Sequence, residues 1–156
     1  MNSFQIDKIL RSNIHTKYFY GGVLAYDQIS YIYYLPNQPI VFVLNTATTN
    51  TPGEHWILVI LSNKICELFD SLALPIEAYK ELIEKLSKIC NSIKITPYRI
   101  QNIYTPSCGY HCILFFLLRT QFKANYIFKN IYFAGKYSDN DILAISCITN
   151  WFPQFF

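Results

Sequence analysis

Two apolar runs joined by a short polar turn constrain the fold of this chain more than any other feature. The first run, HWILVIL, begins at His55, and the second, ICELF, begins at Ile65. The residues between them are Ser62, Asn63 and Lys64. Short runs rich in aliphatic and β-branched residues on either side of a turn are typical of paired strands. The stretch therefore predicts an antiparallel hairpin.

Two further strands are expected, one in IVFVLN from Ile40 and one in IKITPYRI from Ile93. The stretch YFYGGVLAYDQI from Tyr18 mixes aromatic residues with glycine, so we interpret it as a packed loop. A chain of 156 residues is long enough to bury one core without disulfides or metals. The sequence predicts a single domain over residues 1–156 with an α+β fold, a central mixed or antiparallel sheet flanked by helices.

Four helices are expected around this sheet. Ser3 is placed to cap the first, and Pro75 to open a second whose apolar residues recur at helical spacing. The segment 109–118 is apolar on nearly every side, which is typical of a core helix. Ser138 with Asp141 three residues later resembles a capping box at the start of the last helix.

Composition and charge exclude several classes of protein. With 52% hydrophobic and 15% charged residues the chain is not disordered. The apolar run from Cys112 to Leu118 is too short to cross a bilayer, and Asp7 interrupts the region where a signal peptide would be apolar. Five cysteines, an odd number, favour free thiols and an intracellular, reducing compartment. A net charge of +3 with scattered lysines permits contact with nucleic acid but does not indicate it.

Cys108 is the residue whose chemistry the sequence leaves most open. It follows the polar turn Thr105-Pro106-Ser107 and opens the apolar helix, so it is a core residue, a metal ligand or a nucleophile. A turn-to-helix junction supplies unpaired backbone N–H groups that stabilise a thiolate and an oxyanion. Gly109 has no side chain to block a substrate carbonyl.

A zinc site would need Cys108, Cys112 and His111, with Cys66 as the remaining ligand. The spacing Cys-x-x-x-Cys lacks the second ligand pair that structural zinc sites usually have. We therefore expect no metal.

A nucleophilic thiol needs a base, and the chain has three histidines. His15 is interpreted as a surface residue and His111 as a helix residue without a chemical role. His55 opens a strand directly after the turn Pro52-Gly53-Glu54. Asp70 ends the partner strand, so the hairpin brings the two residues to the same end, where a carboxylate can orient the imidazole.

Several motifs in fixed order resemble the adenovirus endoprotease (adenain) family and, more distantly, the proteases that deconjugate SUMO and ubiquitin-like proteins. They are Asn45-Thr46-Ala47, His55-Trp56, Phe69-Asp70, Gln101 and Cys108-Gly109 with Cys112. The resemblance implies a papain-like cysteine peptidase fold with His55 as base, Asp70 as its orienter, Cys108 as nucleophile and Gln101 as oxyanion donor. It departs from the adenoviral pattern at Asp70, where those members carry Glu, and in the shorter chain after Cys108.

The same resemblance implies how substrate is chosen. Strand alternation by itself points Trp56 away from His55 and favours a core aromatic. In the family, however, the tryptophan after the histidine borders the nucleophile and narrows the cleft. The resemblance thus assigns Trp56 and Gly109 to substrate binding and implies an endopeptidase that cleaves viral or virus-like precursor proteins at glycine-containing sites.

Partners and place of action also follow only from the resemblance. No cofactor is needed for the chemistry, but a basic activating peptide attached at Cys90 and weak DNA binding are implied, in the host nucleus or the virion. Three other functions fit parts of the sequence: a SUMO or ubiquitin-like deconjugating protease, an acetyltransferase using the same Cys-His-Asp set, and a binding module without catalysis.

Overall fold

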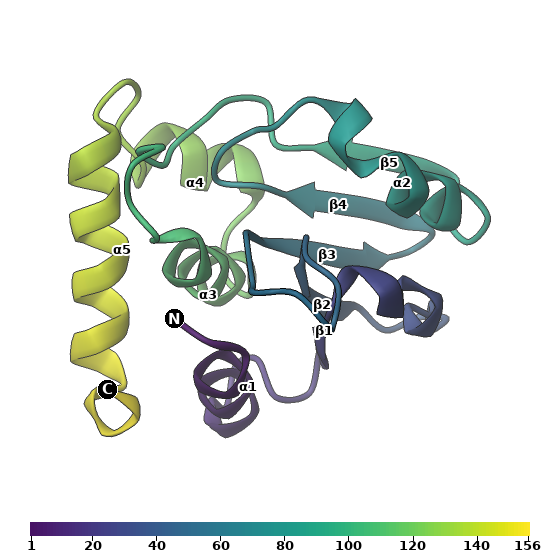
Figure 1. Ribbon diagram of the computed structural model, residues 1–156, viewed down its shortest axis with the longest axis horizontal. Coiled ribbons are helices and arrows are strands. Elements are labelled where there is room, and N and C mark those ends of the chain that lie inside the picture. Colours follow the sequence, from purple (N-terminus) through teal and green to yellow (C-terminus); the bar gives the residue numbers. More distant parts are fainter.

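One mixed five-stranded sheet forms the centre of the protein in a computed structural model that describes residues 1–156 (Figure 1). In sheet order the strands are β1 (Tyr20–Leu24), β2 (Ile40–Asn45), β3 (Trp56–Ser62), β4 (Ile65–Phe69) and β5 (Ser92–Ile95). The α-helices are α1 (Ser3–Ser12), α2 (Lys80–Ser87), α3 (Cys108–Arg119), α4 (Ala124–Asn130) and α5 (Tyr137–Trp151). Three 3-10 helices complete the chain, η1 (Tyr26–Tyr31), η2 (Ile76–Tyr79) and η3 (Pro153–Phe155).

The expected hairpin is confirmed as the antiparallel pair β3–β4. Asn63 and Lys64, between the strands, both have positive φ, 50° and 58°. Two such residues in succession make a turn whose twist matches that of the flanking strands. β2 pairs antiparallel with β3, whereas β1 on β2 and β5 on β4 are parallel, so the sheet is mixed. The α+β prediction is therefore correct.

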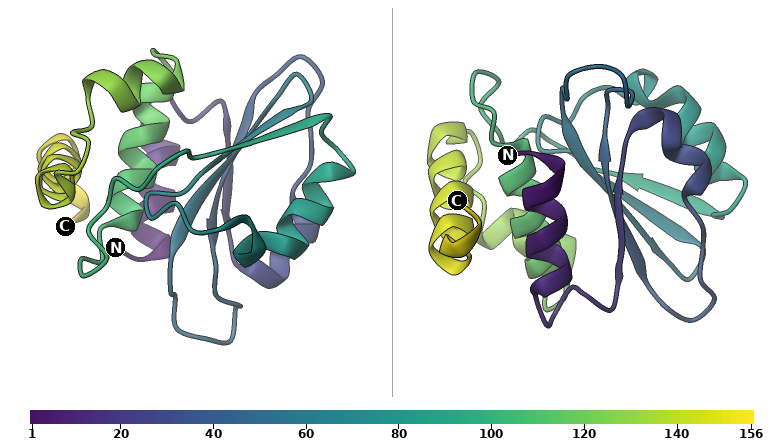
Figure 2. Two further views of the ribbon diagram at one scale, coloured as in Figure 1. Left: turned by 90° about the horizontal axis from the view of Figure 1, so that it is seen from above. Right: turned by 60° about the horizontal axis from the view of Figure 1, so that its bottom comes forward.

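Helices cover both faces of the sheet (Figure 2). One core contains residues of α1, α3, α4 and α5 packed on one face, and a second contains residues of α2, η1 and η2 on the other. Along β3, Leu58 and Ile60 belong to the first core, while Ile57, Val59 and Leu61 belong to the second. A strand covered on both faces has no polar side, which explains the unbroken apolar runs.

Helix α3 is the expected core helix and lies between the sheet and α5 (Figure 1). Phe115 of α3 stacks on Phe69 of β4 with ring centroids 3.9 Å apart. Cys112, one turn after the helix begins, donates from its Sγ to the carbonyl of Trp56 at 3.3 Å. The start of α3 is thus held directly against the start of β3.

The interpretation of residues 18–29 as a loop is wrong. Tyr20 to Leu24 form the edge strand β1, which sequence reasoning missed because Gly21 and Gly22 are poor strand residues. The glycine at position 21 is required by packing, since a Cβ there would lie 2.5 Å from the ring of Phe42 on β2.

Several helix boundaries also differ from expectation. Asn2, not Ser3, caps α1 and exchanges hydrogen bonds with Gln5. Pro75 opens the 3-10 helix η2, and α2 starts only at Lys80. The fourth expected strand is limited to β5, and α4 was not expected. None of the helices is long and apolar enough to cross a membrane.

The capping box expected at Ser138 and Asp141 is not formed. Helix α5 begins at Tyr137, where no side chain caps it, and Asp141 is buried, with 2% of its surface exposed. Its carboxylate accepts hydrogen bonds from another part of the chain instead of from the backbone of its own helix.

Candidate active site

His55 and Asp70 meet at one end of the β3–β4 hairpin. His55 stands immediately before β3, and Asp70 immediately after β4. Their side chains lie 2.6 Å apart, Nε2 of His55 to Oδ1 of Asp70, and both residues are buried. This contact leaves Nδ1 of the imidazole for another partner.

The Asp70 carboxylate has no exposed surface and accepts three further hydrogen bonds. Oδ1 accepts from the N–H of Leu72 at 2.8 Å, and Oδ2 accepts from the N–H of Leu74 at 2.6 Å and from the Tyr79 hydroxyl at 2.8 Å. Burial by itself raises the pKa of Asp70, but the hydrogen bonds from His55, the backbone and Tyr79 outweigh it and lower the pKa. The carboxylate is therefore ionised where it faces His55.

Cys108 is the first residue of α3, and its side chain faces His55 across the site. Burial raises the pKa of this thiol, whereas hydrogen bonding and charge attraction from His55 and the backbone N–H groups of Trp56 and Gly109 lower it. The net pKa lies below the ordinary value of 9.0. These are the surroundings of a reactive thiolate rather than of an inert core cysteine.

The pKa of His55 is shifted in the complementary direction. Burial lowers it, but Asp70 and Cys108 together raise it from 6.5 to about 9. A lowered thiol pKa next to a raised imidazole pKa favours the thiolate–imidazolium ion pair over the neutral thiol and imidazole. An imidazole held between a carboxylate and a thiol can both activate a nucleophile and return a proton.

Gln101 is held from two sides. Its Oε1 accepts from the Ser71 hydroxyl at 2.6 Å, and its Nε2 donates to the carbonyl of Thr105 at 2.7 Å. An amide nitrogen carries two N–H groups, so the second one remains free. The N–H of Cys108 at the start of α3 also has no acceptor in the chain. Both are donors suited to a developing oxyanion.

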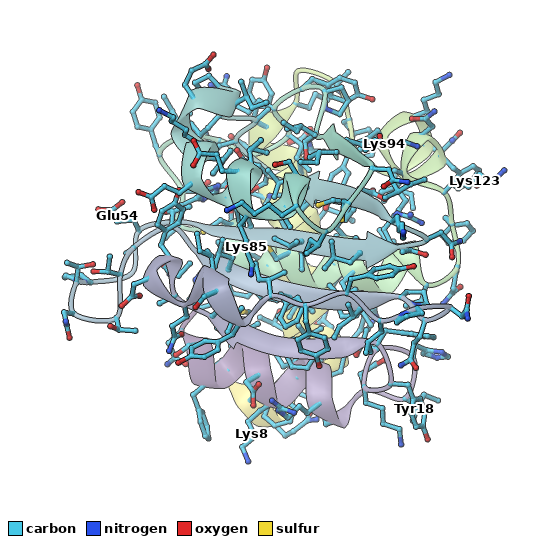
Figure 3. All side chains as sticks on the ribbon, turned by 90° about the vertical axis from the view of Figure 1, so that its right-hand side faces the viewer. Lys8, Tyr18, Glu54, Lys85, Lys94 and Lys123 are labelled. Atoms are coloured by element: carbon cyan, nitrogen blue, oxygen red, sulfur yellow. The ribbon has the colours of Figure 1, made fainter.

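The loop before His55 is fixed by Asn45. Its Oδ1 accepts from the N–H of Ala47 at 2.8 Å and from the N–H of Glu54 at 3.2 Å, which joins the two ends of the loop. The loop projects from the sheet, with Glu54 near its base (Figure 3). The asparagine that the motif singled out thus anchors the chain just before His55.

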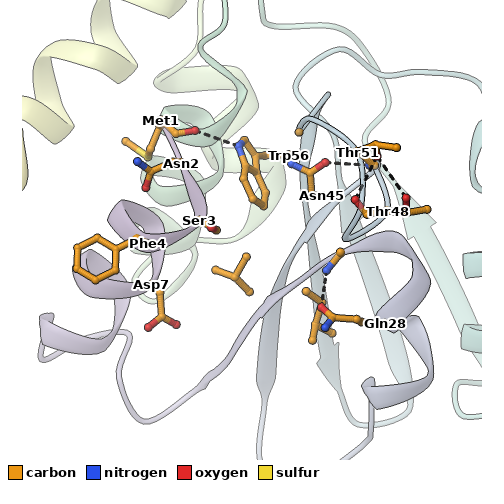
Figure 4. A pocket seen from close by; sticks show the side chains of 15 residues that line it. Met1, Asn2, Ser3, Phe4, Asp7, Gln28, Asn45, Thr48, Thr51 and Trp56 are labelled. Carbon is orange, nitrogen blue, oxygen red and sulfur yellow. Dashed lines mark hydrogen bonds between the residues drawn. The ribbon is translucent and has the colours of Figure 1, made fainter.

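Trp56 lies against Gly109 and also packs on the edge of the first core. A Cβ built on Gly109 would lie 3.3 Å from Cδ1 of Trp56 and 3.3 Å from Cβ of Met1. The indole is half-buried, and its Nε1 donates to the carbonyl of Met1 at 3.3 Å (Figure 4). The strand-alternation interpretation is thus correct in part, since Trp56 packs against the same core as Leu58 and Ile60, but its indole also borders Gly109.

A pocket of about 700 Å³ opens beside Trp56 (Figure 4). Its lining includes Met1, Phe4, Ala25, Asn45, Thr48 and Trp56. Polar and apolar residues both line it, and the pocket is large enough for several residues of an extended peptide.

The other candidate residues lie apart from this site. Cys90 follows α2 in the core on the opposite face of the sheet, with 7% of its surface exposed. Cys66 belongs to the same core. No group of three or more Cys, His, Asp or Glu side chains is placed to hold a metal ion.

Three polar contributors were missed by sequence reasoning. Tyr79 was interpreted only as an apolar helix position, yet its hydroxyl reaches Asp70. Ser71 had no assigned role, although it orients Gln101. His111 is fully buried, and its Nε2 lies 2.9 Å from Oδ1 of Asp141. The one local signal was the position of Ser71 directly after Asp70. The contact of Tyr79 with Asp70 spans 9 positions and that of His111 with Asp141 spans 30, and no short motif indicates either.

Comparison with known proteins shows what this fold resembles. No protein-family model and no curated protein matches the chain. Two crystal structures of the pS273R protease of ASFV, African swine fever virus, are similar in fold, with TM-scores of 0.55 and 0.52 at 17% and 18% sequence identity. Each match covers 90% of this chain, which spans only 64% and 65% of those proteins. At this identity the likeness establishes the shared α+β fold with its mixed sheet.

The shifted pKa values predict that Cys108 reacts first with iodoacetamide at pH 7. Burial raises the pKa of each of the other thiols, including the half-buried Cys147, which is the most exposed of the five. Peptide mapping by mass spectrometry measures the order of labelling. In His55→Ala the Cys108 rate should fall about tenfold for each pKa unit that the thiol regains. Labelling of Cys147 ahead of Cys108 would contradict the prediction.

Proposed function

We propose that this chain is a cysteine endopeptidase of the adenovirus-endoprotease type that cleaves viral or virus-like precursor proteins at glycine-containing sites. The observation that carries the proposal is the position of His55 between two partners: it contacts Asp70 at 2.6 Å on one side and faces the Cys108 thiol on the other. The three residues come from two strand ends and a helix start. The fold shared with a viral protease supports the same class of function.

The chemistry proceeds from the ion pair between Cys108 and His55. The thiolate attacks the carbonyl carbon of the scissile amide, and the carbonyl oxygen becomes an oxyanion that the N–H of Cys108 and the free N–H of Gln101 stabilise. When the C–N bond breaks, the His55 imidazolium gives its proton to the leaving amine. A water molecule, deprotonated by neutral His55, then hydrolyses the thioester and regenerates the thiol.

The position of Trp56 supports cleavage at glycine. The half-buried indole packs against Gly109, the residue after Cys108. We expect it to limit the space at the scissile bond, so that a substrate residue without a side chain fits there and a bulky one overlaps the indole. The pocket on the other side of Trp56 would then receive the neighbouring substrate residues.

The cleavage assay uses two extended peptides that differ only in glycine or leucine beside the scissile bond. We expect kcat/KM to be higher for the glycine peptide, and Cys108→Ala to abolish cleavage of both. Trp56→Ala should reduce this preference while lowering the rate, and Trp151→Ala, which alters an exposed tryptophan, should leave it unchanged. Equal cleavage of glycine and leucine peptides by the unaltered protein would refute the predicted preference for glycine. Cleavage restricted to a SUMO precursor would indicate a deconjugating protease instead.

Asp70→Asn should reduce kcat/KM by roughly 10- to 100-fold. This reduction should be smaller than that in His55→Ala, because an orienting group supports the base but makes and breaks no bond. The pH profile gives a second readout. Activity requires the imidazolium, so it should decline as pH rises through about 9, the pKa of His55. Without the carboxylate this pKa falls, and the decline should move to lower pH. An unchanged alkaline limit in folded Asp70→Asn would contradict this role for Asp70.

Activation by a basic peptide or by DNA is part of the proposal. Lysines such as Lys8 and Lys94 lie at opposite ends of the molecule, so a DNA contact would be diffuse (Figure 3). Any increase in turnover with DNA should disappear as salt is raised.

Because Cys90 is buried and its pKa is raised, a disulfide to the peptide requires the end of α2 to open. Cys90→Ser should prevent that bond and Cys147→Ser should not. Full activity unaffected by either partner would contradict activation.

A further inference from the structure

Asp141 of α5 is a second buried carboxylate near Cys108. Unlike Asp70, it contacts the segment that leads into α3 and not His55. Its side chain is 3% exposed. Oδ1 accepts from the Ser107 hydroxyl at 2.7 Å and lies 2.9 Å from Nε2 of His111. Oδ2 accepts from the Thr105 hydroxyl and from the N–H of Asn102 at 3.2 Å. All four donors belong to the segment 102–111, which surrounds Cys108.

The residue before Asp141 contacts the same segment. Asn140 is fully buried, and its Nδ2 donates to the carbonyl of Ile100 at 2.9 Å. Its Oδ1 accepts from the N–H of Phe133 at 2.8 Å, which holds the loop before α5 in place. Two consecutive residues of α5 thus bind the chain on both sides of Gln101.

These contacts act on the oxyanion donors through Thr105. The Thr105 hydroxyl donates to Asp141, and the Thr105 carbonyl accepts the hydrogen bond of Nε2 of Gln101 at 2.7 Å. The direction of the free Gln101 N–H therefore depends on where Asp141 holds Thr105. Ser107, immediately before Cys108, gives its hydroxyl to Asp141 and does not cap α3, which leaves the N–H of Cys108 free.

The charge of Asp141 fits this function. Burial raises its pKa, but hydrogen bonds from His111, Thr105 and Ser107 outweigh burial and lower it. His111 is itself fixed, since its Nδ1 lies 3.3 Å from the Tyr132 hydroxyl. A buried carboxylate with four donors is a rigid anchor, because release of any one donor removes a hydrogen bond from a buried charge that water does not replace.

We propose that Asp141 is a positioning residue of the site. It holds the segment Gln101–Cys108 so that the free N–H of Gln101 and the N–H of Cys108 point at one oxyanion, and α5 is thereby part of the catalytic apparatus. The inference rests on the proposed peptidase function, and it assigns Asp141 no contact with substrate.

The test compares Asp141→Asn with Asp139→Asn, which removes the same charge from an exposed position on the same helix. An asparagine at position 141 replaces one acceptor oxygen of the carboxylate with an NH2 group, which would face the hydrogen-bond donors that surround this position. We expect kcat for the glycine peptide to fall by about 100-fold, the effect of losing an oxyanion donor, with KM changed by less than about threefold. Asp139→Asn should match the unaltered protein. Asp141→Glu, which retains the acceptor, should recover part of the lost kcat.

Two reagents distinguish a misplaced oxyanion donor from a general loss of Cys108 reactivity. A peptide aldehyde ending in glycinal accepts the thiolate at its carbonyl carbon and a proton at its oxygen, and the resulting hemithioacetal places that oxygen where the oxyanion would form. Its affinity should fall in parallel with kcat in Asp141→Asn. Iodoacetamide needs no oxyanion donor, so its rate with Cys108 should stay within about threefold of the unaltered rate.

Each outcome decides a different point. Unchanged kcat and aldehyde affinity in folded Asp141→Asn would overturn the inference and leave the peptidase proposal intact. A parallel loss of iodoacetamide reactivity would show damage to the Cys108–His55 pair and would also overturn it. If Asp141→Asn does not fold, Thr105→Val removes one donor and should still lower kcat and aldehyde affinity together. Failure of the unaltered protein both to cleave peptide and to bind aldehyde would overturn the proposed function, and this inference with it.

Discussion

The ionised carboxylate of Asp70 is the constraint on which the rest of the site depends. A fully buried charge is tolerated only when it is paired and hydrogen-bonded, and Asp70 meets this condition through His55, Tyr79 and two backbone N–H groups. The backbone donors follow it immediately in sequence, whereas Tyr79 comes from the helical layer on the opposite face of the sheet from α3. Both layers of the fold therefore contribute to the orientation of one imidazole.

The segment from Ile100 to Cys108 has no regular structure, yet it is fixed on two sides. On the sheet side, the Ser71 carbonyl accepts from the N–H groups of Ile100 and Gln101 at 2.9 and 3.0 Å. On the helical side, Asn140 and Asp141 bind the same segment. A loop with so many partners loses its conformational entropy at folding rather than during the reaction, which is what preorganised donors require.

The likeness to the ASFV pS273R protease is one of fold, and it covers 90% of this chain but less than two thirds of those proteins. In this chain the polar contacts of the site converge from strand ends and a helix start, which are places where backbone groups are free to bind.

The sequence by itself determined the elements with strong local patterns and indicated which residues form the candidate site. The β3–β4 hairpin, the core helix α3 and the closeness of His55 to Asp70 followed from apolar runs, a turn and hairpin geometry. Strand β1 was missed because its glycines carry no strand signal and its partner β2 is parallel and distant in sequence. Only the tertiary structure decided that Trp56 faces Gly109 and that Asp141, placed like a helix cap, turns inward to Ser107 and His111. Those contacts join residues tens of positions apart, and local propensity holds no information about which distant donors will surround a carboxylate once the core has packed.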